Sequence, residues 1–587
     1  MKLKLISTLL IISLILTGSM ISAADDYCSL LEKSLLFYKA NRAGRLPDDD
    51  IPWRGDTTLN DAYPSGAKDA NGDGNLSGGY FDAGDGVKFV FPMAYSMTML
   101  GWGYIEFESN INACGLGKMY RDTIKYGTDW LIAAHVSENE MVGQVGNGGA
   151  DHAFWGPPEA MTMARPVYVL STSAPGTEVA MEAASALAAA SIVFKSSDPS
   201  YASTCLSHAK QLYSFGYNYQ GVYSDSIPDA KAFYQSYSGY NDEIAWGGTW
   251  LYKATGDSTY LNQAKSIYAS KYIGSWGVGQ AHSWENKAIG SSLLLFKVTG
   301  DSTYSTDFEK AMNYWLPGGG ITYTPGGLAW LAQWGPNRYT MTMTMLAKIY
   351  GSSKYTSFAQ NQMNYILGQN PNSQSFVVGY GPNHPINPHH RAAHHSTTND
   401  INNPVNNVYL LTGALVGGPD QSDKYQDLRT DYIANEVACD YQAGFVGTLA
   451  ALVSGSGSTS SSSSTSSTSS STSSKPTTSS TSSTSSSSST SSTSSSSTSS
   501  NPTTSSTSST SDNGSTSSIS SSSGTSDSTT SSGVTTNDNV GRDDVSISSN
   551  PSDEQSSANS LMNELNQIFV IVISNSLVVF TFIYFLI

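Results

Sequence analysis

Charged residues are scarce in this sequence, and basic residues are the scarcest. Asp, Glu, Lys and Arg together make up 13% of the 587 residues, and 47 acidic against 30 basic residues leave a formal net charge of −17. That sign argues against nucleic acid or acidic membrane surfaces as partners, because both would repel the chain. An uncharged polysaccharide stays compatible, since it is bound by aromatic faces and hydrogen bonds.

Cysteine is equally scarce. The chain has four cysteines, far apart in sequence: Cys28, Cys114, Cys205 and Cys439. The sequence has no CxxC pair, which argues against a zinc site. Disulfides are compatible with a secreted protein, but the spacing leaves their pairing open.

Long apolar runs are confined to the two ends of the chain. Residues 1–24 combine two lysines, a short apolar stretch and small residues near Ala23, which predicts a secretory signal peptide rather than a membrane span. Residues 551–587 combine small residues, a polar spacer and a terminal apolar tail, which predicts a glycolipid-anchor signal. The alternative is a tail-anchored span. We therefore expect a secreted, extracellular protein that is anchored at the cell surface.

Two regions of unlike composition lie between these ends. Residues 454–550 consist mostly of Ser and Thr and have too little apolar surface to fold, so we expect a disordered, O-glycosylated stalk. Residues 25–453 are rich in Trp, Tyr, Gly and Ala and are long enough for one large catalytic domain.

Helical patterns dominate the large domain, and no convincing series of strands accompanies them. The segments KATGDSTYL and KVTGDSTYS form a weak repeat about 44 residues apart, each ending a predicted helix at a Gly-Asp turn. These features predict an all-α domain of stacked helical hairpins. The predicted helices are 178–194, 241–255, 286–298, 338–350, 358–367 and 432–453.

Two carboxylates are close together in GGYFDAGDGVKF, at Asp82 and Asp85. The neighbouring glycines allow a sharp turn that presents both carboxylates at one place. Such a pair suits the activation of a water molecule, one group accepting its proton while the other holds it. The alternative is a calcium site. However, neither this motif nor NGDG at 71–74 reproduces the twelve-residue calcium loop with its closing glutamate.

A third candidate is Glu436, in YQDLRTDYIANEVACDYQAGF. A glutamate among other acids and aromatic residues can have a raised pKa and donate a proton near neutral pH. The alternative is a solvated helical face on which Arg429 pairs with an acidic neighbour.

Histidines and aromatic residues cluster near polar groups. Five of the nine histidines lie in GPNHPINPHHRAAHHS, where Arg391 would repel a metal cation, so binding of sugar hydroxyls is favoured over a metal site. Aromatic faces stack on pyranose rings, and their recurrence beside polar residues predicts a cleft for a row of sugar units. The histidines are His384, His389, His390, His394 and His395, and the aromatic motifs are DHAFW, FYQSY, SW and WGPNR.

Taken together, these motifs resemble family 9 of the glycoside hydrolases, a cellulase family with an (α/α)6 barrel. The resemblance covers nearly all of residues 27–452. It rests on these blocks, in this order: YFDAGDGVKF, DHAFWGPPEAM, SGYNDEIAW, SWENK, YTPGGLAWLAQWGPNRY, ILGQNPNSQSFVVGYGPNHPINPHHR and DLRTDYIANEVACDYQAGF.

The resemblance implies an endo-β-1,4-glucanase that cleaves internal bonds of cellulose with inversion. Asp85 would be the general base, Asp82 would help to hold the water, and Glu436 would be the general acid. The carboxyl groups of an inverting pair stand about 6.5–9.5 Å apart. We therefore expect residues remote in sequence to meet across one cleft.

The resemblance also implies roles for further residues and for partners. No cofactor is expected for catalysis, and the partner is cellulose or another β-1,4-glucan bound by a monomer. His389 and Asp427 join the catalytic set. The expected substrate-binding residues are His152, Trp155, Trp284, Trp334, Arg338, Arg391 and Tyr441, and a structural calcium ion would be held by Ser238, Gly239, Asp242 and Glu243.

The chain departs from the family pattern at four positions, none of them a proposed catalytic carboxylate. Three alternatives stay open: an exo-acting or processive enzyme, an enzyme for another β-glycan, and a non-catalytic glycan-binding protein on a stalk. The intact carboxylates argue against the last. The departures are Gln442, His384, Gln369 and Glu285.

Overall fold

The computed structural model describes residues 27–47, 51–64 and 74–453. The predicted signal peptide (1–24), stalk (454–550) and C-terminal tail (551–587) lie outside the described residues. None of the helices within the described ranges combines the length and the apolar composition that a membrane crossing needs.

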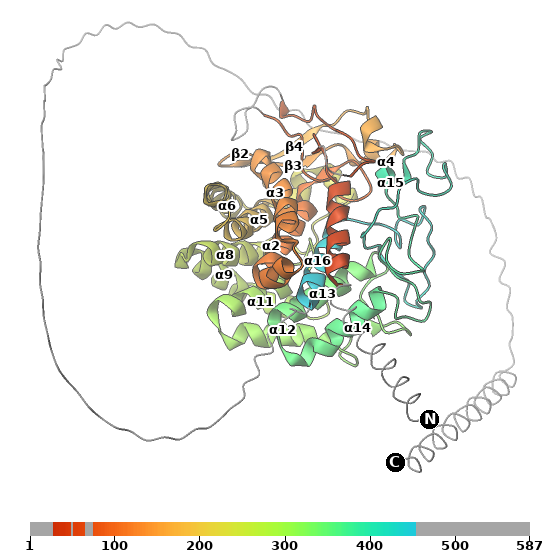
Figure 1. Ribbon diagram of the computed structural model, residues 1–587. Coiled ribbons are helices and arrows are strands. Elements are labelled where there is room, and N and C mark those ends of the chain that lie inside the picture. Colours follow the sequence, from red (N-terminus) through yellow and green to blue (C-terminus); the bar gives the residue numbers. More distant parts are fainter. Residues whose placement is uncertain (1–26, 48–50, 65–73, 454–587) are drawn as a thin grey trace, which may run out of the picture. The chain divides into compact units, whose positions relative to one another are not determined.

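Six long helices form a closed inner ring, each packed against the next, and α16 closes the ring on α2. Each outer helix follows its inner partner in the chain, except that a helix over residues 27–40 covers α16, where Gln442 Nε2 donates to Ser34 O at 2.9 Å. This is the predicted (α/α)6 barrel (Figure 1). The inner helices are α2 (Val90–Ala113), α5 (Thr177–Val193), α8 (Asn241–Thr255), α11 (Ala288–Thr299), α13 (Pro336–Tyr350) and α16 (Cys439–Leu452), and the outer ones are α3 (Gly117–Ala134), α6 (Pro199–Asn218), α9 (Ser258–Ser270), α12 (Ser302–Tyr314) and α14 (Thr356–Ile366).

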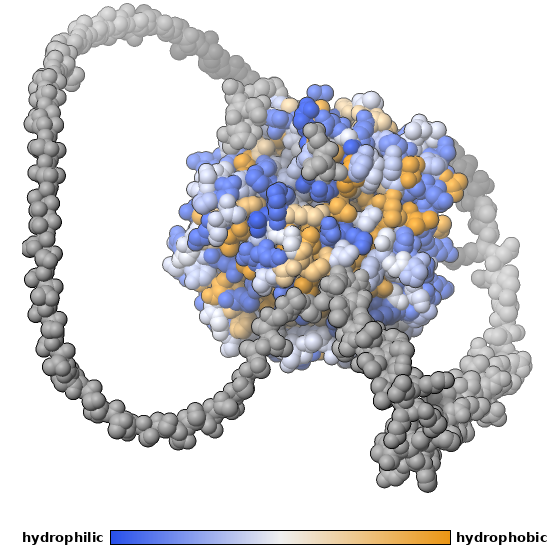
Figure 2. Space-filling view, viewed as in Figure 1, coloured by the Kyte–Doolittle hydropathy of each residue, from blue (hydrophilic) through white to orange (hydrophobic). Residues whose placement is uncertain are grey.

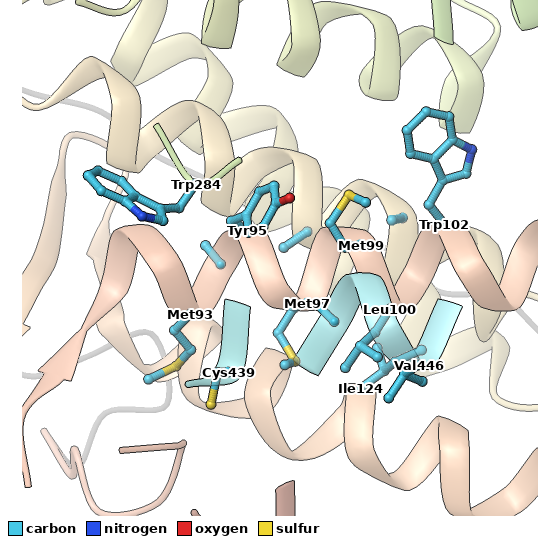
Figure 3. Packing of buried hydrophobic residues seen from close by; sticks show 14 of the residues in the cluster. Met93, Tyr95, Met97, Met99, Leu100, Trp102, Ile124, Trp284, Cys439 and Val446 are labelled. Carbon is cyan, nitrogen blue, oxygen red and sulfur yellow. The ribbon is translucent and has the colours of Figure 1, made fainter. Parts of the chain in front are cut away.

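The inner helices are largely buried because their neighbours surround them. Every residue of α5 except Ile192 is buried, as expected for a core helix rather than a surface helix. Small side chains allow close approach: a Cβ on Gly101 of α2 would lie 2.9 Å from that of Ala189 on α5. Figure 3 shows α2 packing through methionine and aromatic side chains, with Val446 of α16 in the same cluster.

The repeated TGDST segments form the inner-to-outer hairpin turns. Gly256 and Gly300 end their helices with φ of +74° and +71°, a conformation that favours glycine. Asp257 and Asp301 then cap the following outer helices, each accepting a main-chain N–H at 2.9 Å. The two predicted turns are confirmed.

The predicted helix bounds agree with the structure to within two residues, with one exception. The helix predicted over 432–453 begins only at Cys439. The preceding residues are instead drawn into the rim of the barrel: Glu436 forms a parallel bridge with His389, and its carbonyl accepts from Gly417 N at 2.9 Å. These bonds replace helical ones, so the prediction was wrong over 432–438.

No pattern in the sequence predicted the short antiparallel strands that the structure contains. β3 pairs with β1, β2 and β4 and leads into the short helix α4, which ends at His152 and so delivers the DHAFW motif to the rim. A second hairpin pairs β5 with β6. The strands are β1 (Lys88–Phe89), β2 (His135–Ser137), β3 (Glu140–Val145), β4 (Val167–Ser171), β5 (Thr322–Tyr323) and β6 (Ala329–Trp330), and the short helices are α4 (Gly148–His152), α7 (Tyr223–Ser226), α10 (Ile273–Trp276), α15 (Arg391–His394), η2 (Pro158–Ala160), η3 (Pro228–Ala232) and η4 (Ser353–Tyr355).

One disulfide, Cys28–Cys114, joins the 27–40 helix to the residue that follows α2. Cys205 and Cys439 are buried free thiols. The pairing that the sequence left open thus links an outer helix to the neighbouring inner one. It closes a loop of 86 residues, which in the chain-entropy treatment stabilises the fold by about 4–5 kcal/mol.

Candidate active site

A cavity of about 890 Å³ lies among the rim loops of the barrel. Its volume is within the range of small-molecule sites, and both aromatic and charged side chains line it. The structure brings ten of the predicted site residues together here: Asp82, Asp85, His152, Trp155, Trp284, Trp334, Arg338, His389, Arg391 and Glu436.

Main-chain hydrogen bonds join the segments that carry these residues. Arg391 N donates to Gly84 O at 3.0 Å, and Cys439 N donates to Asp82 O at 2.9 Å. A Cβ on Gly84 would lie 2.2 Å from His389 O, so only glycine allows this approach. We call residues 82–85 the aspartate wall and residues 432–441 the glutamate wall.

In the aspartate wall the two carboxylates have different partners. Asp82 is 3% exposed, its Oδ2 accepts the Tyr234 hydroxyl, and its Oδ1 has no partner among the described residues. Asp85 Oδ1 accepts from Ala83 N at 3.3 Å. Tyr234 thereby fixes one oxygen of Asp82 and leaves the other for a small ligand such as water.

Burial and neighbouring charges give Asp82 and Asp85 different pKa values. Burial and then the Asp85 carboxylate raise the pKa of Asp82 well above its usual value. The pKa of Asp85 is raised to about 6, by burial and then by Asp151, although His152 and Arg391 lower it. Asp82 therefore holds the proton of the pair longer, and Asp85 is the carboxylate that can accept one near neutral pH.

In the glutamate wall one oxygen of Glu436 is fixed by two neutral donors. The Tyr441 hydroxyl and Trp334 Nε1 each donate to Glu436 Oε2 at 2.6 Å. Burial raises the pKa of Glu436, while these two bonds and the charge of Arg338 lower it. The other oxygen has no hydrogen bond within the described part of the chain, so a protonated Glu436 can donate from it into the cavity.

Tyr441 was predicted to bind substrate, and the structure corrects this. Its side chain is 1% exposed and lies behind Glu436, with the Arg338 guanidinium 4.8 Å from its ring centroid. Arg338 also pairs with Asp440 at 3.5 Å. Tyr441 therefore orients the carboxyl group of Glu436 and is too buried to contact a sugar.

His389 and Arg391 face the cavity with fixed orientations. His389 Nδ1 donates to Arg429 O at 2.7 Å, which leaves Nε2 as the acceptor in the neutral ring. The pKa of His389 is lowered to about 4, chiefly by burial, so the ring is neutral near pH 7. Arg391 Nη1 donates to Asp151, which also accepts from Gly86 N at 3.1 Å.

Asp427, predicted as catalytic, does not line the cavity. Its carboxylate accepts the main-chain N–H groups of Ile386 at 2.7 Å and Asn387 at 3.1 Å. It therefore holds the segment that leads to His389, and a direct catalytic role is not supported.

The alternative that paired Arg429 with an acid is also wrong, because its guanidinium donates to Asn407 and to main-chain carbonyls.

Aromatic side chains are spread around the cavity. Trp334 is 44% exposed, and its ring centroid lies 5.4 Å from that of Tyr432. Tyr237 is 77% exposed, whereas Trp284 is packed edge-on against Tyr234 at 4.8 Å. The lining thus includes both open and anchored aromatic rings, which suits the binding of sugar rings.

Sequence reasoning missed two residues that orient the site. Tyr234 was noted only as part of an aromatic motif, and Asp151 only as the neighbour of His152. Each contacts its partner across more than 150 positions of sequence, Tyr234 to Asp82 and Asp151 to Arg391. Their position inside motifs of the family resemblance was the available signal.

Two groups of side chains have the donor atoms that a cation would need. Asp85, Asp151 and His152 have ligand atoms within 4.8 Å of one another, but the Arg391 guanidinium already neutralises Asp151. At the predicted calcium site, Asp242 Oδ1 and Glu243 Oε2 are buried and accept no N–H or O–H group from another described residue, although the two carboxyl groups lie close enough to share a hydrogen bond with each other. Such oxygens fit the ligand chemistry of calcium.

The other members of the predicted calcium site lie on the loop before α8. Ser238 Oγ donates to Glu285 O at 3.0 Å, and Gly239 O accepts from Ser236 Oγ at 3.3 Å. Lys287 Nζ lies 3.3 Å from Glu243 Oε1. The buried carboxylates are thus partly balanced by an ammonium group, and two of their oxygens are left for a cation.

Comparison with known proteins gives a consistent result. The pattern of glycosyl hydrolase family 9 matches residues 27–449. The chain is 69% identical over 453 residues to an endoglucanase of Dictyostelium discoideum, covering 77% of this chain and 64% of the relative, so it spans less than two thirds of that relative's length.

Solved structures of similar fold are also endoglucanases or cellulases. An endoglucanase of the termite Nasutitermes takasagoensis is 46% identical with a TM-score of 0.69, over 73% of this chain and 98% of that one. The cellulase Cel9M of C. cellulolyticum, solved with cellobiose, is 37% identical with a TM-score of 0.66 and the same coverage.

Proposed function

The chain belongs to glycosyl hydrolase family 9, and we propose that it is an endo-β-1,4-glucanase that hydrolyses internal bonds of cellulose with inversion of configuration. The observation that carries the proposal is the meeting of Asp82, Asp85 and Glu436 on one aromatic-lined cavity. The endoglucanase names of the relatives support it.

Asp85 takes the proton from the attacking water. Its pKa of about 6 keeps it ionised at neutral pH yet basic enough to accept a proton. Asp82, with one oxygen fixed by Tyr234, offers its other oxygen to the same water. The water then attacks the anomeric carbon from the side of the aspartate wall.

Glu436 gives its proton to the leaving glycosidic oxygen. Burial raises its pKa and so favours the protonated form that an acid catalyst needs. Tyr441 and Trp334 hold one oxygen and leave the other for the leaving group. His389 and Arg391, fixed by Arg429 O and Asp151, bind hydroxyl groups of the sugar next to the cleaved bond.

The test is product analysis on carboxymethyl cellulose and cello-oligosaccharides. We expect a rapid fall in viscosity, and α-anomers as the first products in NMR spectra. Asp85→Asn and Glu436→Gln should abolish both signals while keeping the fold. A wild-type protein that binds glucan without cleaving it would instead establish the glycan-binding alternative. Slow loss of viscosity with cellobiose release would indicate exo or processive action, and faster turnover of xyloglucan or mixed-linkage glucan would indicate another β-glycan.

A structural calcium ion is part of the proposal. Asp242 and Glu243, with Ser238 and Gly239, would hold it between α8 and the loop that contains Glu285. Its charge would offset the buried carboxylates and stabilise that loop. Chelation should then lower the melting temperature without changing kcat at temperatures where the protein stays folded.

We also propose that the protein is secreted and attached to the cell surface as a monomer. This rests on the sequence of residues 1–24, 454–550 and 551–587 alone. Release from membranes by a phosphatidylinositol-specific phospholipase would support a glycolipid anchor, and retention would support a membrane-spanning tail. Light scattering of the released protein tests the monomer.

A further inference from the structure

Trp155, which lines the cavity, is held from one side by a single neighbouring segment. Its indole Nε1 donates to His394 Nδ1 at 2.7 Å, and its main-chain N–H donates to Asn399 Oδ1. On its other side the ring lies edge-on to His389, with centroids 4.7 Å apart, and the Arg391 guanidinium lies 5.4 Å from the ring. Trp155 therefore packs against both polar groups that face a bound sugar, and its own orientation sets the shape of the cavity beside them.

The tautomer of His394 is fixed by its partners. An indole N–H can only donate, so Nδ1 of His394 must be the acceptor and Nε2 must carry the hydrogen. That hydrogen is donated to Pro404 O at 2.7 Å. The imidazole is fully buried, and burial lowers its pKa, so the neutral form that both bonds require is the favoured one.

The carbonyl at Pro404 belongs to the 396–409 loop, which has few apolar anchors. Val405 is 82% exposed and Val408 is 52% exposed, and hydrophobic side chains appear on the surface near α15 in Figure 2. Apart from Tyr409, whose ring stacks on Trp53 with centroids 5.2 Å apart, hydrogen bonds hold this loop. Arg429 supplies several of them, including one to Pro404 O at 2.9 Å and one to Ile401 O at 2.8 Å.

We propose that His394 is a positioning residue that fixes the Trp155 ring against His389 and Arg391 and ties it to the 396–409 loop. By this means His394 sets the affinity of the cleft for the sugar unit at Trp155. The inference deepens the proposed function, because it takes the bound ligand to be a β-1,4-glucan chain. His394 itself lies behind the tryptophan and does not line the cavity.

Two conservative variants separate its two hydrogen bonds. His394→Asn places an amide oxygen near the position of Nδ1 and can still accept from Trp155, whereas His394→Gln places an amide nitrogen near Nε2 and can still donate to Pro404 O. Loss of one buried hydrogen bond corresponds to roughly a 3- to 10-fold effect on affinity. We expect His394→Gln to raise KM for cellopentaose by that factor, with kcat changed less than twofold and a smaller rise for His394→Asn.

His395→Asn is the matched control. This neighbour has a φ of +56°, which asparagine tolerates well, and its ring packs against Tyr409 rather than Trp155. We expect its KM to equal that of the wild type. Thermal melting of every variant shows that the compared proteins are folded.

A double-mutant cycle tests whether His394 acts through the indole. Trp155→Phe has no ring N–H to donate, so adding His394→Gln to it should cause no further rise in KM. An equal rise in both backgrounds, an unchanged KM in His394→Gln, or a loss confined to kcat would each overturn the inference.

Binding measurements keep this test independent of turnover. Tryptophan fluorescence titration with cellopentaose in a Glu436→Gln background should show the same 3- to 10-fold weakening for His394→Gln. A wild-type enzyme inert on carboxymethyl cellulose would defeat the proposed function alone. If Glu436→Gln binds cellopentaose with the same affinity with and without His394→Gln, the proposed role of His394 is wrong.

Discussion

Burial raises the pKa of the carboxyl groups in both walls of the cleft, but the groups that surround them differ. In the aspartate wall, burial and then the Asp85 carboxylate raise the pKa of Asp82, and burial and then the neighbouring Asp151 carboxylate raise the pKa of Asp85. In the glutamate wall, two neutral donors and one arginine act against the burial of Glu436. Burial thus raises the pKa in both walls; neighbouring carboxylates raise it further in the aspartate wall, whereas two neutral donors and Arg338 lower it in the glutamate wall.

The two walls also resemble each other in one respect, since each leaves one carboxylate oxygen without a hydrogen-bond partner among the described residues. Each wall fixes one carboxylate oxygen with a tyrosine hydroxyl, Tyr234 on Asp82 and Tyr441 on Glu436. The second oxygen of each has no partner in the part of the chain that the structure describes. Because Asp82 holds its proton longer, Asp85 can take a proton on one side while Glu436 gives one on the other, which is the requirement of single displacement.

The largest expected effects follow from replacing the base in one wall or the acid in the other. A substrate whose leaving group needs no acid then distinguishes the two variants. Asp85→Asn and Glu436→Gln should each lower kcat on cellotetraose by about 10²- to 10⁴-fold. A dinitrophenyl leaving group needs no acid, so only Glu436→Gln should recover activity on dinitrophenyl cellobioside. Steady-state kinetics on both substrates measure this, and equal recovery by Asp85→Asn would contradict the assignment of roles.

Gly84→Ala should break the contact between the aspartate wall and the segment that carries His389. The new Cβ would meet His389 O at 2.2 Å, so the backbone must move, at a cost of about 1–3 kcal/mol. We expect a lower melting temperature and at least a 100-fold loss of kcat. Gly55→Ala, whose Cβ would make only an ordinary contact at 3.4 Å, is the control.

In the wild type, the pH profile of kcat/KM should fall on its acid side because of the aspartate wall and on its basic side because of the glutamate wall. Asp85 must be ionised, so kcat/KM should fall by about tenfold per unit as the pH drops below about 6. Glu436 must be protonated, so the rate should fall again as the pH rises past its raised pKa. A profile that stays flat down to pH 4 would show that Asp85 is not the base.

Of the two tyrosines, only Tyr441 should affect the basic limb of the pH profile. The Tyr441 bond lowers the pKa of Glu436, so Tyr441→Phe should shift the basic limb to higher pH. Tyr234→Phe removes the corresponding bond to Asp82 and should leave the basic limb in place. Each variant should lose roughly 3- to 10-fold in kcat. If both variants shift the same limb, the walls do not titrate separately.

The smallest effect concerns Asp427, which supports a cleft segment from outside. Asp427→Ala removes the acceptor for two main-chain N–H groups and should cost about 1 kcal/mol of stability, with kcat lowered less than threefold. Asp427→Asn keeps one acceptor oxygen, so its free energy of unfolding, measured by chemical denaturation, should lie closer to that of the wild type. A loss above 100-fold in Asp427→Asn would restore the catalytic role.

The helical barrel could be predicted because its signals are local. Apolar residues on every side of a segment indicate a buried helix, and the TGDST turns specify a left-handed glycine followed by a capping aspartate. The failure at 432–438 has the opposite cause. There the main chain of Glu436 bonds to Gly417, a partner that no local pattern indicates.

The candidate site was predicted in its residues but not in their arrangement. The motifs supplied the carboxylates and the aromatic side chains, since those residue types suit sugar chemistry. Tyr234 and Asp151 were missed as orienting groups, and the structure does not support the catalytic role predicted for Asp427 or the substrate contact predicted for Tyr441. In each case the deciding contact is made by a residue that is distant in sequence or buried behind the cleft.

The sequence by itself determined the hairpin barrel, the family and the three carboxylates, because helix periodicity, turn chemistry and residue type are properties of short segments. Only the tertiary structure decided which oxygen of each carboxylate is left open and which carboxyl group of the aspartate pair keeps its proton. Those properties depend on burial and on charges brought together from several loops, and such distances exist only once the chain has folded.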